Sequence, residues 1–483
     1  FQLRSTGFTM KIGLMHYHLK TGGVTTCVKN QVEALKSDCD VCVITGEVPQ
    51  AGFPAKTIHI PELTYSADYH RSFNPEKVAA VMVRSIESHF GGPCDIVHVH
   101  NPILAKNKSF LKILKALQKR GLSLLLQIHD FAEDGRPRSY FKEDYPQDCH
   151  YSVINSRDYR ILLKSGLKKQ GLHQIFNAVY FPDKPSPLAE SGDRPYVAYP
   201  VRAIRRKNIG EAILLSLFFR DNETLVITLP PNSQADIDSY EDWKSFVSRY
   251  QLRVEFERGL DRPYEAILSS ARYLLTTSIT EGFGFSYLEP WLFNKSVGGR
   301  KLGDICADFE ANGLGFNHMY TALNIPVDWL ELEDFFKKWK STIRNTAGLF
   351  DLSIDNDRIQ RTFASITAGG KIDFGLLDEE FQKQVIERLL THPLHTHANK
   401  LMSLNPFLAE FGRAAREKDL IENNRQAVAR SYGMSQYRQR LLEIYRHVDK
   451  TRIRQRIDKK KLLAEFVDLS NFSLLKWGDY GPR

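Results

Sequence analysis

The sequence predicts an α/β protein built from two doubly wound domains, and three observations lead to this fold class. The chain has 483 residues, whereas a single hydrophobic core rarely grows beyond about 250–300 residues. Short apolar, β-rich runs alternate with amphipathic helical patterns, which is typical of a parallel sheet covered by helices on both faces. A segment rich in Pro, Ser, Asp and Gly interrupts this alternation, which then starts again.

The first domain is expected over residues 10–185. Its predicted strands are 11–17, 41–46, 95–100, 122–129 and 151–155, and its helices include 24–36 and 109–120. Residues 1–9, FQLRSTGFT, are interpreted as the remnant of an expression tag, because a clean apolar strand begins at Met10.

The second domain is expected over residues 186–440, after the linker-like segment NAVYFPDKPSPLAESGDRP. Its predicted strands are 196–200, 224–230, 253–257 and 273–278, and its helices include 208–218 and 264–271. A helical insertion is expected at about 330–400, where 370–400 is too irregular to assign. Residues 441–483 are expected to form C-terminal helices that pack back toward the N-terminal domain.

Composition narrows the class of protein without naming a function. The net charge of +9 suits phosphate-bearing ligands, nucleic acid or an anionic membrane, and does not select among them. No nucleic-acid-binding module is recognisable, so nucleic acid is not an expected partner. Six scattered cysteines do not make a disulfide scaffold, and no apolar run approaches the ~20 residues of a membrane span. A cytoplasmic location is therefore expected, whereas the oligomeric state is left open.

The stretch TEGFGFSYLEP, residues 280–290, follows a predicted strand. Gly282 and Gly284 would each be unfavourable in a helix interior by roughly 1 kcal/mol, so a glycine turn that opens a helix near Gly284 or Phe285 is expected. Backbone amides there would face an anion, and the carboxylates of Glu281 and Glu289 could accept sugar hydroxyls. A phosphate together with hydroxyls describes a nucleotide sugar. The alternatives are that Glu281 only caps the helix and that Glu289 is only surface charge.

Other candidates also follow predicted strands. Arg202 and Lys207 come after the first strand of the second domain, where a guanidinium fork and a point cation suit a phosphate. In the first domain, Gly22 and Gly23 lie between the first strand and the first helix, and His129 ends a strand. The His-x-His pairs at 16–18 and 98–100 suggest a metal, but no acidic or cysteine ligands occur at suitable spacing nearby, so no metal is expected.

These features occur in an order that resembles the retaining glycosyltransferases of family 4. The E-x7-E signature is EGFGFSYLE, residues 281–289, and the other matching segments are GG at 22–23, DIVHVHN, QIHD, VINSRD, FNAV, Arg202 with Lys207, VEFERG, TTSITEGFG and YGMSQYRQRLLEIY. The family adopts the GT-B fold, in which two Rossmann-like domains face each other across a cleft. The resemblance implies a hexosyltransferase that uses a nucleoside-diphosphate sugar and retains the anomeric configuration.

The resemblance also implies a role for each matching residue. Arg202 and Lys207 would neutralise the donor diphosphate, and Gly22 and Gly23 would lie under it. Glu281 would face the transferred sugar, Glu289 would hold the ribose, and His129 would lie beside the anomeric centre. Sugar hydroxyls and phosphate would meet the backbone of Gly282, Phe283, Gly284 and Phe285. The leaving phosphate itself would accept the acceptor's proton in a front-face reaction. Neither a metal nor another cofactor is expected.

The residues that follow His129 and the second-domain loops bear on the acceptor and on the nucleotide. The segment ITLPPNS stands where the family usually has a glycine-rich turn, so the nucleotide is not predicted. Arg136 and Arg138 follow His129 and suggest a small polar acceptor. An anionic acceptor, such as a sugar acid or a phosphorylated sugar, is one such candidate. The alternatives are a lipid-linked or glycan acceptor at a membrane surface, suggested by the basic amphipathic segment KNKSFLKILKALQKR, and a sugar phosphorylase or nucleotide-sugar epimerase of the same fold.

Overall fold

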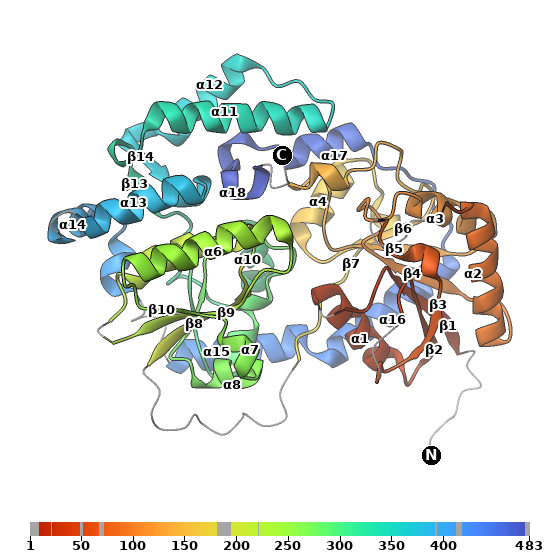
Figure 1. Ribbon diagram of the computed structural model, residues 1–483. Helices are drawn as coiled ribbons and strands as arrows, with labels where there is room; N and C mark the ends of the chain where they lie inside the picture. The colour runs from red at the N-terminus through yellow and green to blue at the C-terminus, as the bar shows by residue number, and fades with distance from the viewer. Residues whose placement is uncertain are drawn as a thin grey trace. The chain divides into compact units, whose positions relative to one another are not determined.

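The computed structural model describes residues 9–20, 22–48, 52–66, 72–180, 195–220, 222–391, 394–411 and 418–478. The chain divides into two compact units (Figure 1). The first comprises Phe1–Val179 and Tyr432–Val467, and the second comprises Tyr180–Ser431 and Asp468–Arg483. The expected tag remnant lies outside the described residues, except for residue 9.

The first unit contains a seven-stranded sheet in the order β3-β2-β1-β4-β5-β6-β7, and all its pairings are parallel. The strands are β1 (Met10–His16), β2 (Cys39–Thr45), β3 (Lys56–His59), β4 (Ile96–His100), β5 (Leu124–Ile128), β6 (His150–Val153) and β7 (Leu172–Gln174). Every residue of β4, β5 and β6 is buried, as expected for central strands covered on both faces.

Helices provide that cover with two separate apolar clusters. The helices are α1 (Gly23–Leu35), α2 (Pro75–Phe90), α3 (Phe110–Lys119), α4 (Ser156–Lys164), α16 (Met434–Lys450) and α17 (Lys459–Phe466). Side chains of α2 and α3 belong to one cluster, and those of α1 and α16 belong to the other. The apolar face of α3 therefore packs in the protein core and is not available to lie on a membrane surface.

The second unit contains a five-stranded parallel sheet in the order β10-β9-β8-β11-β12. Its strands are β8 (Tyr196–Arg202), β9 (Thr224–Leu229), β10 (Val254–Phe256), β11 (Leu274–Thr276) and β12 (Val297–Gly299). Its helices include α5 (Ile209–Ser216), α6 (Gln234–Arg249), α7 (Arg258–Asp261), α8 (Tyr264–Ser270), α9 (Glu289–Leu292), α10 (Gly303–Ala311) and α15 (Lys418–Tyr432). The doubly wound α/β fold class is thus confirmed in both halves of the chain.

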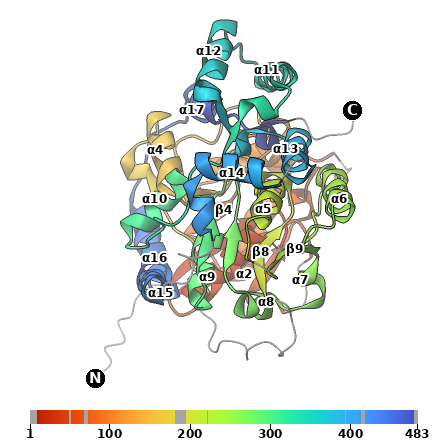
Figure 2. The ribbon, with the colours of Figure 1, turned by 90° about the vertical axis from the view of Figure 1, so that its left-hand side faces the viewer.

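A two-stranded antiparallel sheet accompanies the expected helical insertion. Strands β13 (Asn324–Pro326) and β14 (Lys371–Asp373) pair around α11 (Leu332–Leu349) and α12 (Asn356–Ile366), and α13 (Glu379–Thr391) and α14 (Leu394–Leu404) follow. Helix α13 packs against both α5 and α14 (Figure 2). Through α13, the segment 370–400 that the sequence left unassigned is thereby attached to helix α5 of the second unit.

The end of the chain differs from the expectation for residues 441–483. The chain enters the first unit at Tyr432, before the expected boundary at 440, and returns to the second unit at Asp468. Helix α18 (Leu474–Trp477) packs against α11, so only part of the C-terminal segment belongs with the N-terminal domain. Among the helices that the structure describes, none combines the length and the apolar character needed to cross a membrane.

Candidate functional site

The predicted site residues fall into two groups, one in each unit. In the second unit, the structure brings Lys207 and Glu281 together. Lys207 ends a 3-10 turn (Arg205–Lys207) after β8, and Glu281 lies in the loop after β11. Lys207 Nζ donates to Glu281 Oε1, and the two side chains are only 16% and 10% exposed. Burial would raise the pKa of Glu281, but the charges of Lys207 and Arg206 outweigh it and lower the pKa, so this carboxylate is ionised at neutral pH.

The backbone at Lys207 and Asn208 is held by a set of buried and partly buried hydrogen bonds. The hydroxyls of Tyr199 and Thr277 donate to the Lys207 carbonyl oxygen at 2.6 and 3.1 Å. Asn208 adopts a left-handed conformation with φ 52°, which asparagine tolerates better than most residues. Its amide group donates to Glu211 at 2.8 Å and accepts from Gln382 Nε2 at 2.8 Å.

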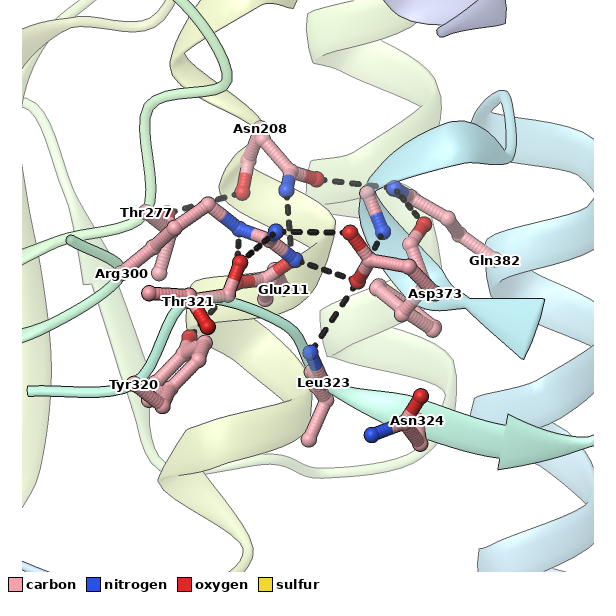
Figure 3. Close-up of polar contacts among 12 residues, drawn as sticks. Asn208, Glu211, Thr277, Arg300, Tyr320, Thr321, Leu323, Asn324, Asp373 and Gln382 are labelled. Carbon is pink, nitrogen blue, oxygen red and sulfur yellow. Dashed lines mark hydrogen bonds and ion pairs between the residues drawn. The ribbon is translucent and has the colours of Figure 1, made fainter. Parts of the chain in front are cut away.

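Behind this turn lies a buried ionic network centred on Arg300 (Figure 3). The Arg300 guanidinium donates to Glu211 at 2.9 and 2.6 Å and to Asp373 at 2.8 Å on both oxygens. The Tyr320 hydroxyl also donates to Glu211. Since Asp373 ends β14, the network joins the insertion to the turn that carries Lys207.

The segment after Glu281 corrects the expected helix. No long helix begins at Gly284 or Phe285: a 3-10 turn spans Phe285–Tyr287, and the four-residue α9 begins at Glu289. Gly284 has φ 92°, and a Cβ there would lie 2.9 Å from the Tyr287 ring and 3.1 Å from Ile305. The glycine is required by this packed turn, and such short elements carry little of the dipole that a long helix offers an anion.

Phe283, between the two glycines of this segment, has its side chain inside the protein. The Phe283 side chain is buried and makes an edge-to-face contact with Phe285 at 5.1 Å between ring centroids. Phe283 is therefore a packing residue, and its backbone rather than its ring is what a ligand could meet.

Glu289 is neither a mid-helix residue nor a plain surface charge. It is half-buried and accepts a hydrogen bond from the Tyr264 hydroxyl at 2.6 Å. Burial raises the pKa of Glu289 to about 7, although the bond from Tyr264 acts in the opposite direction. Arg202, the last residue of β8, donates to the Pro230 carbonyl oxygen at 3.0 Å.

In the first unit, His129 directly follows β5 and ends a chain of buried hydrogen bonds. His100 Nε2 lies 2.9 Å from Gln31 Oε1, and because an amide oxygen only accepts, this nitrogen carries the proton. His100 Nδ1 must then accept from His129 Nε2 at 2.8 Å, which leaves the lone pair of neutral His129 on Nδ1. Burial lowers the pKa of His129 to about 4, so the ring is neutral at pH 7.

The remaining predicted residues of the first unit occupy less enclosed positions. Gly23 begins α1, and a Cβ there would meet no atom within 4 Å; Gly22 is extended, with φ 171°. Arg136 donates to Asp130 at 2.7 Å and to the Phe131 carbonyl at 3.2 Å, so its guanidinium is already partly engaged. Arg138 is exposed.

Two groups of potential metal ligands occur among the described residues, and both lie in the first unit. Cys27, His100 and His129 form one group. The Cys27 thiol, however, donates a hydrogen bond to Asn177 Oδ1, and burial raises the pKa of this thiol to about 12. Both nitrogens of His100 are also engaged, so this group does not suit a metal. The second group is His150, His173 and His447.

Comparisons with known proteins agree with this architecture. No protein-family model matches the chain. The mannosylglucosyl-3-phosphoglycerate synthase of Petrotoga mobilis is 28% identical over 341 residues, which cover 62% of this chain and 66% of that protein, slightly less than two thirds of its length. A glycosyltransferase from Rickettsia africae superimposes with a TM-score of 0.54 at 13% identity, covering 92% of this chain and 99% of that one.

Two further solved structures cover a similar share of the chain. Anabaena Alr3699/HepE in complex with UDP and glucose has a TM-score of 0.53 at 12% identity, covering 90% of this chain and 99% of that one. The sucrose-phosphate synthase of Thermosynechococcus elongatus has a TM-score of 0.51 at 15% identity, covering 90% and 98%. The chain has the GT-B fold.

Within this GT-B fold, sequence reasoning missed the residues that support the predicted ones. Asn208 carried a weak signal, since an asparagine before a helix is a common left-handed residue. Tyr264, Glu211, Arg300 and Gln382 carried none, because each meets its partner only through the fold.

Proposed function

We propose that this protein is a retaining glycosyltransferase that moves a sugar from a nucleoside-diphosphate sugar to a hydroxyl group. The observation that carries the proposal is the enclosed Lys207–Glu281 pair at the carboxyl ends of β8 and β11. Ligands bind beyond this edge of parallel sheets in doubly wound folds. A partly buried cation beside an ionised carboxylate offers separate contacts for a phosphate and for a sugar hydroxyl.

In this proposal the second unit binds the donor. Lys207 and Arg202 offset the negative charge that develops on the leaving diphosphate, which is the main electrostatic demand of the transition state. The diphosphate competes with Glu281 for Lys207, and the released carboxylate accepts a hydroxyl of the transferred sugar. Glu289 accepts the ribose hydroxyls. The leaving phosphate takes the acceptor's proton, so the reaction needs positioning rather than a protein base, and no metal is assigned to it.

The first unit supplies His129 and the acceptor contacts. The hydrogen bonds from Gln31 through His100 keep the His129 lone pair on Nδ1, where it can accept a sugar hydroxyl near the anomeric carbon. We propose an acceptor that carries a phosphate or a carboxylate, recognised by Arg138 and by Arg136 as positioned by Asp130. The name of the Petrotoga mobilis relative supports an anionic acceptor, because its product contains phosphoglycerate.

A thermal-shift panel tests the donor. UDP-, GDP- and ADP-sugars, their free diphosphates and sugar 1-phosphates are added to the wild type and to Lys207→Ala and Glu289→Ala. A ligand that binds only the folded state raises the melting temperature by mass action. One nucleotide series is expected to stabilise the wild type, with the shift reduced at least by half in both variants. Lys337→Ala, at an exposed position of α11, is the matched control.

Two results would contradict the proposal. Stabilisation by sugar 1-phosphates in place of nucleotides would indicate a phosphorylase of the same fold. With the donor identified, NMR of the product reports its anomeric configuration, and inversion would exclude the retaining mechanism.

A further inference from the structure

Three histidines of the first unit, none of them among the proposed donor or acceptor residues, lie close together. His150 is the first residue of β6, His173 lies in β7, and His447 lies near the end of α16. Their potential ligand nitrogens all lie within 4.8 Å of one another. His150 begins β6 and pairs with Leu125 near the start of β5, whereas His129 follows the carboxyl end of β5, so this cluster belongs to the opposite edge of the sheet.

Hydrogen bonds to the backbone orient two of these rings. His150 Nε2 lies 2.9 Å from the Thr451 carbonyl oxygen, and His447 Nε2 lies 2.9 Å from the Gln170 carbonyl oxygen. A carbonyl oxygen only accepts, so each Nε2 carries the proton and each neutral ring keeps its lone pair on Nδ1. Metal-binding histidines almost always donate their other ring N–H in this way, to a carbonyl or a carboxylate.

The third ring faces the first. His173 Nε2 lies 2.9 Å from His150 Nδ1, and because His150 Nδ1 accepts, His173 donates. A metal ion can take the place of this shared proton when His173 carries its proton on Nδ1 instead. Tetrahedral zinc with Zn–N bonds of about 2.0–2.1 Å sets its ligand nitrogens roughly 3.3 Å apart. The His150–His173 pair would therefore open by a few tenths of an ångström, and His447 would approach.

We propose that His150, His173 and His447 bind one Zn²⁺ ion, with water in the fourth position. Imidazole nitrogens suit zinc among the common divalent cations, whereas the hard ions Mg²⁺ and Ca²⁺ prefer oxygen ligands, which this set lacks. His447 is exposed and gives the ion access, while His150 and His173 are buried. The ion ties α16 to β6 and β7, so it stabilises the segment that returns to the first unit.

The test uses the 483-residue chain without a polyhistidine tag, treated with EDTA and desalted. Zinc chloride is titrated in competition with a chromophoric chelator, and melting temperatures are measured with and without zinc. One equivalent is expected to bind at micromolar or lower concentration and to raise the melting temperature by several degrees. His447→Gln and His173→Gln are expected to weaken binding at least tenfold and to abolish the shift. His59→Gln, an exposed histidine of β3, is expected to retain both.

The proposal is overturned if the wild type does not bind one equivalent of zinc, or if the wild type and His447→Gln bind zinc equally well. The His447 side chain is exposed, so this variant decides the matter even if His173→Gln fails to fold. Loss of zinc from His129→Gln, with retention in His447→Gln, assigns the ion to the Cys27 group and also overturns it. Cobalt(II) gives an independent reading, because a tetrahedral site shows intense visible bands and a six-coordinate ion shows weak ones.

Discussion

At the scale of single residues, Glu289 couples stability to pH. Burial raises the pKa of this carboxyl from 4.5 to about 7. Between pH 4.5 and about pH 7, the Glu289 carboxyl binds more protons in the folded protein than in the unfolded chain. Its contribution therefore makes the folded state less stable as the pH rises through this range. Ionised Glu289 therefore costs stability at pH 8, where the proposed ribose contact requires the carboxylate.

The substitution Glu289→Gln removes this titration and keeps the shape of the side chain. As the pH rises from 5 to 8, we expect the free energy of unfolding of the ligand-free variant to increase by on the order of 1–3 kcal/mol relative to that of the wild type. This is less than the full pKa difference would give, because the group is half-buried. Urea denaturation at both pH values measures it. Glu333→Gln, at an exposed position of α11, is expected to show no such change. Parallel pH profiles for the wild type and Glu289→Gln would contradict the assignment.

At the scale of elements, the insertion supports the turn between β8 and α5. Arg205 pairs with Glu379 of α13, and Gln382 of the same helix donates to Asn208. Arg300 then connects Glu211 of α5 to Asp373 of β14. The insertion thus contributes to the position of Lys207 without supplying any of the predicted ligand contacts.

Removing Arg300 tests this connection. Glu211 is completely buried, so Arg300→Met leaves a carboxylate without its cation and is expected to cost about 3–5 kcal/mol of stability. Asp373 is 23% exposed, and Asp373→Asn leaves the Arg300–Glu211 pair intact, so about 1–2 kcal/mol is expected there. Denaturant unfolding measures both, with Arg361→Met at an exposed position of α12 as the control. Equal effects of Arg300→Met and Arg361→Met would refute the role of the network.

At the scale of the whole molecule, the first unit is completed by a segment from the end of the chain. Helix α16 buries Tyr437, Leu441, Ile444, Tyr445 and Val448 in the cluster that it shares with α1. Full burial of each such side chain contributes about 1.5–3 kcal/mol. The sum is on the order of 10 kcal/mol, which is comparable to the net stability of about 5–15 kcal/mol of a typical protein.

A chain that ends at Val179 is therefore expected not to fold. The same chain joined through a flexible linker to residues 432–467 is expected to recover cooperative unfolding, because α16 then covers the sheet. Near-UV circular dichroism and urea denaturation distinguish the two. A third chain with the α16 residues in scrambled order controls for the added length. Cooperative unfolding of the shorter chain at the midpoint of the joined one would contradict this account.

Sequence reasoning predicted the central strands and the strand-end positions of Arg202, Lys207, Glu281 and His129. Central strands are continuous apolar runs, and the residue that follows a strand is read directly from the chain. Short edge strands such as β3, β7 and β12 were missed, because three or four residues carry too little pattern. The helix expected near Gly284 or Phe285 is only a 3-10 turn, because Gly284 has a positive φ in a turn so close to Tyr287 and Ile305 that a Cβ would not fit, and local propensity does not contain these contacts.

The sequence by itself therefore determined the fold class and the candidates for donor binding, since both depend on local hydrophobic periodicity and on residue type. Only the tertiary structure decided which side chains work together. Lys207 meets Glu281, Arg300 meets Glu211 and Asp373, and three histidines from β6, β7 and α16 meet one another. These groups join segments far apart in the chain. Burial then changes their proton affinities, and no local pattern records a contact or a desolvation that exists only after folding.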